Sequence, residues 1–287
     1  MRVTVLGMDP RIASTRYRAI APAKYLREHG VTLCGSDGDL VIVGKHGFDI
    51  DLLNDFKAMI YDVCDDWFAD EKDGPFYREM CEKATEVTCN SEVMRFRIFQ
   101  ETGRIATVIP DAFEHEEWEP SWGAGLLWFG NPLNLPDFAK AVDKLKGLSV
   151  PMGCISRHED YMAEDVKKLI IPWSHTAVDK GLKSCAVVII PTGASAAKSA
   201  NRLIESVRAG KFVVAEPLPA YEEFSDWMWV GDLREGVEWA MQNEASCLKR
   251  VKDCQRYIKK NYSIEKLGPK WLEVVKKAYP WQQALSA

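Results

Sequence analysis

The residue types best suited to ligand chemistry gather in one stretch of the sequence, residues 191–210. A strand-like apolar run ends at Pro191, a loop of small residues follows, and a helical pattern then continues to Gly210. Unpaired backbone N–H groups at the start of a helix attract negative charge, and small loop residues let a phosphate approach the backbone. Lys198 adds a positive charge and Ser199 a hydroxyl at that position. The stretch therefore predicts a site for an anion such as a diphosphate.

Asn201 and Glu205 extend this candidate site along the helix. They are four residues apart, so their side chains share one helix face. A carboxylate one turn beyond a phosphate site is well placed to accept hydrogen bonds from ribose hydroxyls. The alternative is an ordinary helix start with solvated side chains at Lys198 and Glu205. The clustering of lysine, serine, asparagine and glutamate around a single helix start favours the binding interpretation.

Further candidates follow other apolar runs. Asp65 and Asp66 come after one run, where a carboxylate could act as a general base toward a hydroxyl, or could only cap a turn. His46 follows another run and is a second candidate base or acceptor ligand. Arg157 follows the run at 150–156 and is expected to face the bound phosphates.

The elements that must position these residues alternate between strand and helix. Short runs rich in β-branched residues are separated by amphipathic stretches, which is typical of a parallel sheet with helices on both faces. The predicted strands of the first half are 2–7, 40–44, 58–63, 86–89 and 105–109. Those of the second half are 126–130, 150–156, 169–172, 186–191, 211–216 and 228–230. The main predicted helices are 16–29, 48–57, 75–84, 91–102, 136–146, 175–184, 199–209, 233–260 and 264–278.

The two series of strands predict an α/β chain of two Rossmann-like domains that face each other across a cleft, with C-terminal helices packing back across the domains. An acidic, aromatic stretch at 111–125 is broken by proline and glycine and is interpreted as the interdomain linker. The predicted ranges are an N-terminal domain at 1–120, a C-terminal domain at 121–262 and a returning helix at 263–287. Because open parallel sheets bind ligands at the carboxyl ends of their strands, we expect the site in that cleft.

Composition excludes several classes of protein. The chain of 287 residues has a formal net charge of -5, which argues against a nonspecific nucleic-acid coat rich in lysine and arginine. Its eight cysteines are scattered without a Cys-x-x-Cys pair, as expected for reduced thiols in a cytoplasmic protein. No apolar run is long enough to span a bilayer, so we expect no integral membrane contact. The Asp-x-Asp pattern at 49–51 precedes a helical pattern and is interpreted as capping, so no metal is predicted.

A Lys-Ser-x-Asn-Arg run begins at Lys198, and an Ile-Glu-Ser-Val-Arg-Ala-Gly helix and a Phe-Val-Val-Ala strand follow it. This segment resembles the donor-binding segment of GT-B fold glycosyltransferases, and among them the group whose motif is a glutamate, seven residues and a second glutamate. Glu205 matches the second glutamate, which in that family binds the donor ribose. The first glutamate would fall at Ala197, where this sequence departs from the family.

Other segments agree with this resemblance. Arg16 and Arg18 lie in the segment after the first strand, which in such enzymes holds acceptor or diphosphate, and their spacing lets only one of them point inward. Gly130 and Asn131 resemble the glycine turn where backbone amides approach the donor phosphates. Trp173 falls where such enzymes contact the nucleotide base.

The resemblance implies transfer of a hexose or pentose from a nucleoside diphosphate sugar, such as a UDP-sugar, to a hydroxyl acceptor. The sugar nucleotide is a co-substrate, no other cofactor is expected, and the nearest relatives retain the anomeric configuration. Two acceptor classes stay open. One is a saccharide or glycan precursor, and the other is the hydroxymethylated bases of phage DNA, for which Arg95, Arg97 and Arg104 could form a basic rim. The alternative function is a noncatalytic sugar-nucleotide-binding module of the same fold, which the missing glutamate at Ala197 favours.

Overall fold

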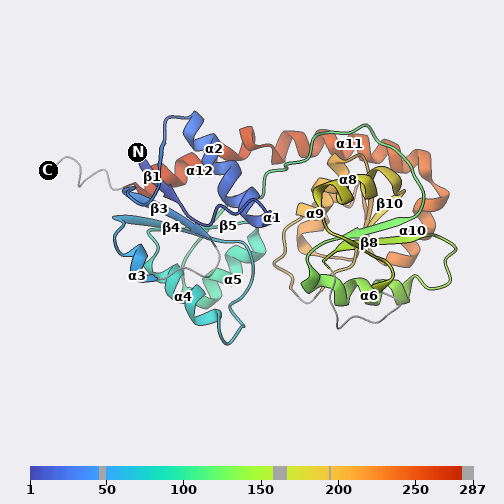
Figure 1. Cartoon of the computed structure of the whole chain (residues 1–287), viewed down its shortest axis with the longest axis horizontal. Helices are drawn as coiled ribbons and strands as arrows, with labels where there is room; N and C mark the ends of the chain where they lie inside the picture. Colours follow the sequence, from blue (N-terminus) through green and yellow to red (C-terminus); the bar gives the residue numbers. More distant parts are fainter. Residues whose placement is uncertain (45–49, 158–166, 194, 280–287) are drawn as a thin grey trace. The chain divides into compact units, whose positions relative to one another are not determined.

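The computed structural model describes residues 1–44, 50–157, 167–193 and 195–279, which divide into two compact units (Figure 1). The first unit contains Met1–Phe113, Ala196–Ser199 and Lys260–Ala287, and the second contains Glu114–Ser195 and Ala200–Lys259. The chain passes between units after residues 113 and 259, whereas the predicted limits are 120 and 262. The sequence pattern does not anticipate that Ala196–Ser199 clusters with the first unit.

The first unit is built on a six-stranded parallel sheet in the order β2-β1-β3-β4-β5-β6. Its strands are β1 (Arg2–Val5), β2 (Thr32–Cys34), β3 (Leu40–Gly44), β4 (Ala58–Val63), β5 (Glu86–Cys89) and β6 (Thr107–Val108). The central strand β4 is buried along its whole length, as expected when helices cover both faces of a parallel sheet. The apolar runs predict five of these strands and miss β2, whose three residues are partly exposed at the edge of the sheet.

Helices cover both faces of this sheet (Figure 1). On one face α2 (Ala21–Glu28) and α12 (Ile264–Ala278) share a core that includes Val3, Leu26 and Trp271. The other face carries α4 (Gly74–Lys83) and α5 (Glu92–Thr102), whose buried residues Tyr77, Met80, Met94 and Ile98 pack with those of the sheet. The C-terminal helix therefore returns to the N-terminal sheet.

The predicted helix at 16–29 is interrupted. The short α1 (Ala13–Thr15) leads into a π-helical turn, η1 (Arg16–Ile20), before α2 begins. Wide turns of this kind are frequent at functional sites. The remaining helix among the described residues of this unit is α3 (Ile50–Leu53). The predicted stop at Gly103 is confirmed, because this glycine ends α5 with a φ of 69° in the left-handed region.

The second unit has a parallel sheet in the order β12-β11-β10-β7-β8-β9 (Figure 1). Its strands are β7 (Leu126–Phe129), β8 (Met152–Ser156), β9 (Ile170–Pro172), β10 (Val187–Ile190), β11 (Phe212–Ala215) and β12 (Trp229–Val230). Its described helices are α6 (Leu135–Lys144), α8 (His175–Ser184), α9 (Asn201–Arg208), α10 (Leu233–Gln242) and α11 (Glu244–Tyr262), with 3-10 turns η2 (Pro132–Asn134) and η3 (Pro219–Phe224). Two parallel sheets with flanking helices confirm the predicted α/β fold class.

One predicted helix of this region is wrong. The pattern at 233–260 suggests a single helix, but α10 and α11 are separate because Asn243 leaves the helical conformation, with φ -129° and ψ 40°. The side-chain amide of Asn243 donates a hydrogen bond to the backbone carbonyl oxygen of Trp239 at 2.7 Å. An asparagine that binds its own backbone in this way ends a helix more readily than it continues one.

The stretch interpreted as a linker packs on the second unit from residue 114 onward. Side chains of that unit donate hydrogen bonds to its backbone carbonyl oxygens: Arg208 to residue 115 at 3.3 Å, Gln255 to residue 118 at 2.8 Å and Lys211 to residue 121 at 3.0 Å. A Cβ on Gly123 would lie 2.1 Å from the carbonyl oxygen of Ser184, so only glycine allows this approach. The segment is therefore a fastened part of the second unit and not an open connection.

Candidate functional site

The carboxyl edge of the second sheet has the topology of a ligand site. Its first strand, β7, lies between β8 and β10, so the strand order reverses direction there. Open parallel sheets bind ligands outside the carboxyl ends of the strands at such a reversal. Gly130 and Asn131 follow β7 at this edge, and Thr192 and Gly193 follow β10.

Hydrogen bonds hold the turn after β7 rigid. The N–H of Gly130 donates to the carbonyl oxygen of Ile155 at 3.1 Å, and the Ser156 hydroxyl donates to the carbonyl oxygen of Gly130 at 2.9 Å. The side chain of Asn131 accepts from the N–H of Leu133 at 3.0 Å and starts η2. Gly130 and Asn131 are thus held in one geometry at the predicted phosphate turn, and their contact with a donor stays a prediction.

Arg157 and Trp173 lie at the same edge, one strand and two strands further along. Ser156 and Pro172 are register partners on β8 and β9, and each directly precedes one of these candidates. Arg157 is exposed, and Trp173 is half-buried with its ring 4.9 Å from that of His175. The structure therefore brings Gly130, Arg157 and Trp173 to the ends of three adjacent strands.

The helix predicted at 199–209 begins at Asn201, which is half-buried. Ala200 precedes the helix and has no side chain that could cap its N–H groups, which leaves them available to an anion. Lys198 and Ser199 are half-buried and belong to the segment that clusters with the first unit. Ala197 anchors this segment, because it is 4% exposed and packs in the first unit's core. Lys198 and Ser199 thus cluster with the first unit and Asn201 with the second.

Glu205 has a structural role that the sequence does not reveal. Its side chain is 8% exposed, and its two carboxylate oxygens accept the N–H groups of Glu114 and His115, both at 2.8 Å. Burial raises the pKa of Glu205, and the two backbone hydrogen bonds offset part of that rise. This carboxylate fastens the start of the 114–121 segment to α9. The ribose-binding role of Glu205 stays a prediction.

The corresponding edge of the first sheet holds a buried ionic network. Arg18 is 4% exposed and donates two hydrogen bonds to Asp62, at 3.0 and 2.5 Å, and one to Asp111 at 3.2 Å. Burial lowers the pKa of Arg18, but the two carboxylates outweigh burial and raise it. Thr88 completes the network by donating to Asp62 at 2.6 Å. Of the two predicted arginines, Arg18 points inward, while Arg16 is half-buried and donates to the carbonyl oxygen of Pro10 at 2.9 Å.

A cavity of about 150 Å³ lies beside this network. It is lined by Gly7, Ser14, Arg18, Gly44 and Asp62, among others, at the ends of β1, β3 and β4. The Ser14 hydroxyl is buried and has no hydrogen-bond partner among the described residues. Sequence reasoning misses Asp62 and Ser14. A charged residue inside the otherwise apolar run Ala58–Val63 is the signal that identifies Asp62.

Two of the three predicted bases, Asp65 and Asp66, lie among the described residues. Asp66 accepts the N–H of Phe68 at 3.3 Å and pairs with Arg97 at 3.4 Å, contacts that fit the turn-forming alternative. Asp65 is half-buried and accepts from the Cys64 thiol at 3.8 Å. His46 lies outside the described residues. A catalytic role for any of the three stays a prediction.

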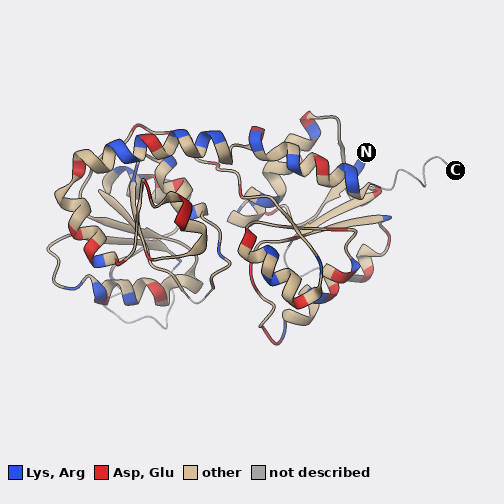
Figure 2. Cartoon of the chain, turned by 180° about the vertical axis from the view of Figure 1, so that it is seen from behind, with Lys and Arg blue, Asp and Glu red and all other residues tan. Residues whose placement is uncertain are grey.

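The arginines considered for a basic rim are engaged within the first unit. Arg95 pairs with Glu92 at 2.6 Å, and Arg97 pairs with Glu101 at 2.8 Å. Arg104 donates to backbone carbonyl oxygens, one of them at 2.8 Å. Figure 2 shows acidic and basic residues interspersed along the helices of this unit. These residues therefore form a mixed-charge surface and not a uniformly basic one.

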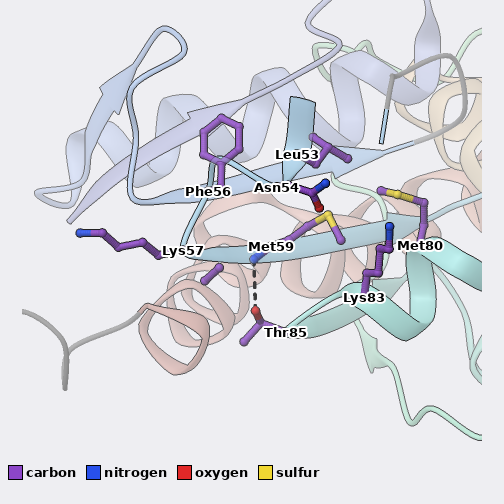
Figure 3. A pocket seen from close by; sticks show the side chains of 9 residues that line it. Leu53, Asn54, Phe56, Lys57, Met59, Met80, Lys83 and Thr85 are labelled. Atoms are coloured by element: carbon purple, nitrogen blue, oxygen red, sulfur yellow. Dashed lines mark hydrogen bonds between the residues drawn. The ribbon is translucent and has the colours of Figure 1, made fainter. Parts of the chain in front are cut away.

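A second cavity, of about 250 Å³, opens at the opposite edge of the first sheet (Figure 3). It is lined by Phe56, Lys57 and Met59 at the start of β4, and the N–H of Met59 donates to the Thr85 hydroxyl at 3.1 Å. Parallel sheets bind ligands at the other edge, so this cavity is not the candidate site. Within the described ranges no three His, Cys, Asp or Glu side chains are grouped to hold a metal ion, and no described helix could cross a bilayer.

Comparisons with known proteins agree on the fold. Neither a protein-family model nor a curated protein sequence matches the chain at a significant level. Anabaena HepE, solved in complex with UDP and glucose, matches with a TM-score of 0.72 at 11% identity, over 96% of this chain and 99% of its own. An alpha-glucosyltransferase in complex with UDP-glucose and DNA containing an abasic site matches with a TM-score of 0.68 at 9% identity, over 96% and 98%. TarM matches with a TM-score of 0.63 at 15% identity over 82% of this chain and 54% of its own, so this chain spans about half of TarM. The fold is that of the GT-B glycosyltransferases.

Proposed function

We propose that this chain is a glycosyltransferase that moves a sugar from a nucleoside diphosphate sugar to a hydroxyl acceptor. The carrying observation is that the fold agrees over 96% of the chain with HepE, a protein solved with UDP and glucose. The edge of the second sheet supports it, because Gly130, Arg157 and Trp173 directly follow three adjacent strands where such sheets bind nucleotides. A UDP-sugar is the first donor to test.

In the proposed reaction the acceptor oxygen bonds to the anomeric carbon while the bond from that carbon to the diphosphate oxygen breaks. The nucleoside diphosphate leaves with the electron pair of the broken bond, and the acceptor proton passes to a base, for which Asp65, Asp66 and His46 are the candidates. The charge that develops on the diphosphate is stabilised by positive side chains and by the N–H groups at the start of α9. Lys198, Ser199 and Asn201 complete the proposed donor ligands, and no metal is invoked.

The acceptor is proposed to be a saccharide or glycan precursor, with hydroxymethylated DNA bases as the second class. One protein of similar fold was solved with DNA, which keeps that class in the test. The engagement of Arg95, Arg97 and Arg104 with their own unit favours the saccharide, because DNA binding gains most of its affinity from cations available to phosphates.

A noncatalytic sugar-nucleotide-binding module is the second candidate function. Its supporting observation is Ala197, which stands where the family motif has a carboxylate and is buried in the first unit's core. Such a module would bind a sugar nucleotide without turnover.

One assay separates these functions. The full chain is incubated with UDP-, dTDP-, GDP- and ADP-linked sugars, together with an oligosaccharide mixture or with duplex DNA that contains hydroxymethylcytosine. Mass spectrometry then follows the release of nucleoside diphosphate and the gain of one sugar by an acceptor. We expect transfer in one acceptor arm. Binding without turnover supports the module, and the absence of binding to any sugar nucleotide would refute both functions.

A further inference from the structure

The second unit holds a positively charged side chain without an ionic partner at its ligand edge. Arg202 is the second residue of α9, the helix that follows β10, so it lies where the strand order of the sheet reverses. Its guanidinium forms no hydrogen bond and no ion pair with any described residue. Asp137 exerts an electrostatic influence on it but forms no ion pair with it.

Two neighbours fix the position of this guanidinium. Its central carbon lies 5.2 Å from the ring centroid of Trp128, a fully buried residue of β7. A Cβ on Gly130 would lie 2.6 Å from Nη2 of Arg202, so the arginine occupies the space that a side chain at position 130 would need. The stacked ring and the bare glycine backbone hold the planar group against the predicted phosphate turn.

Few groups of the protein compensate the positive charge of Arg202. Burial lowers the pKa of Arg202, because loss of hydration disfavours the charged form and no adjacent carboxylate compensates. The Nε1–H of Trp128 is also buried without a hydrogen-bond partner among the described residues. Arginine offers five N–H donors in a planar fork that matches phosphate oxygens. Arg202 is only half-buried, and a phosphate-bearing ligand matches the chemistry of its guanidinium.

We propose that Arg202 binds the diphosphate of the sugar nucleotide and that Trp128 and Gly130 position it for that contact. This inference rests on the proposed function and differs from the sequence interpretation, which places Lys198 in that role. Lys198 belongs to the segment that clusters with the first unit, whereas Arg202 is contributed by the second unit together with its phosphate turn. Arg202 is thus the donor-binding cation of the unit that holds the nucleotide.

The test is isothermal calorimetry on the full chain with UDP, uridine and inorganic pyrophosphate as separate probes. Arg202→Met is expected to weaken UDP binding about 10- to 100-fold, the range for losing charge-assisted hydrogen bonds, and to leave uridine binding unchanged. The UDP affinity of Arg202→Lys should fall between those of the wild type and Arg202→Met, because lysine keeps the positive charge but lacks the planar guanidinium. Arg250→Met is the matched control, since Arg250 also stacks on a tryptophan, Trp239 at 4.9 Å, but lies on α11.

Gly130→Ala gives an independent test, because the added methyl group must displace the guanidinium. It should reproduce the loss of UDP affinity, and the double variant Gly130→Ala with Arg202→Met should lose no more than either change alone. Equal UDP affinity in wild type, Arg202→Met and Arg202→Lys would overturn the inference. Pyrophosphate binding that depends on Arg202, with no nucleoside diphosphate bound by the wild type, would uphold Arg202 as the anion ligand and overturn the proposed function.

Discussion

Glu205→Ala is predicted to destabilise the second unit whether or not a ligand is bound. Its buried carboxylate accepts the N–H groups of Glu114 and His115, both at 2.8 Å. Hydrogen bonds to a charged group contribute about 1.5–3 kcal/mol each. The cost of burying the carboxylate, which raises the pKa of Glu205, offsets part of that gain. We therefore expect the free energy of unfolding to fall by about 2–4 kcal/mol, and the Tm of a unit of this size to fall by roughly 8–16 °C.

Calorimetric unfolding combined with amide hydrogen exchange measures both parts of this prediction. The amide protons of Glu114 and His115 should lose their protection in Glu205→Ala. Glu205→Gln should retain about half of the stabilisation, because a glutamine side chain has only one acceptor oxygen. The matched control is Glu238→Ala, whose side chain is 47% exposed and pairs with Arg234 on the same helix, so its effect should stay within about 0.5 kcal/mol.

The pH dependence of stability gives the sign of the Glu205 contribution. A raised pKa means that the folded state holds this proton more tightly than the unfolded chain does. Protonation of Glu205 therefore adds stability below the ordinary glutamate pKa, and this increment is lost as the pH rises through the raised value. The slope should be absent in Glu205→Gln. If Glu205→Ala kept the wild-type unfolding free energy and exchange at residues 114 and 115, the fastening role would be refuted.

Three other changes test the remaining structural conclusions. Lys211→Met should lower the free energy of unfolding by about 2–4 kcal/mol, since it leaves the buried carbonyl oxygen of Cys185 and two part-buried oxygens of Ser121 without their donor. Because burial lowers the pKa of Lys211, wild-type stability should rise with pH between that lowered pKa and the ordinary value of 10.5, a rise that urea titrations of the variant should lack. Arg18→Met should lower the free energy of unfolding by about 3–5 kcal/mol, because two buried carboxylates lose their charged partner, whereas Arg11→Met, at an exposed pair, should change it by under about 0.5 kcal/mol. Equal effects in urea unfolding would contradict the buried network. Gly123→Ala should lower the Tm of the second unit by several degrees, because its methyl group would meet a carbonyl oxygen, while Gly35→Ala meets nothing within 4 Å and should leave the Tm unchanged.

Local patterns in the sequence determined the strands of both sheets except the edge strand β2. Buried parallel strands need continuous apolar residues, so the runs that became β4 and β10 were readable directly. Gly103 was readable as a helix stop because a left-handed φ favours glycine in any fold. The alternation of these elements then restricts the chain to a doubly wound α/β arrangement, and the Lys198–Glu205 run pointed to the GT-B fold.

Partners of the buried charged side chains were decided only by the tertiary structure. Glu205 and Lys211 contact residues 114, 115 and 121, about 90 positions away in the chain. Arg18 of η1 pairs with Asp62 of β4. The sequence shows that a charged residue is present. It does not show whether the neighbours of that residue in space are backbone N–H groups, a carboxylate or an aromatic ring. A glutamate therefore binds backbone N–H groups at position 205 and lies half-exposed at position 238. The difference arises because burial and distances are set only when the chain folds.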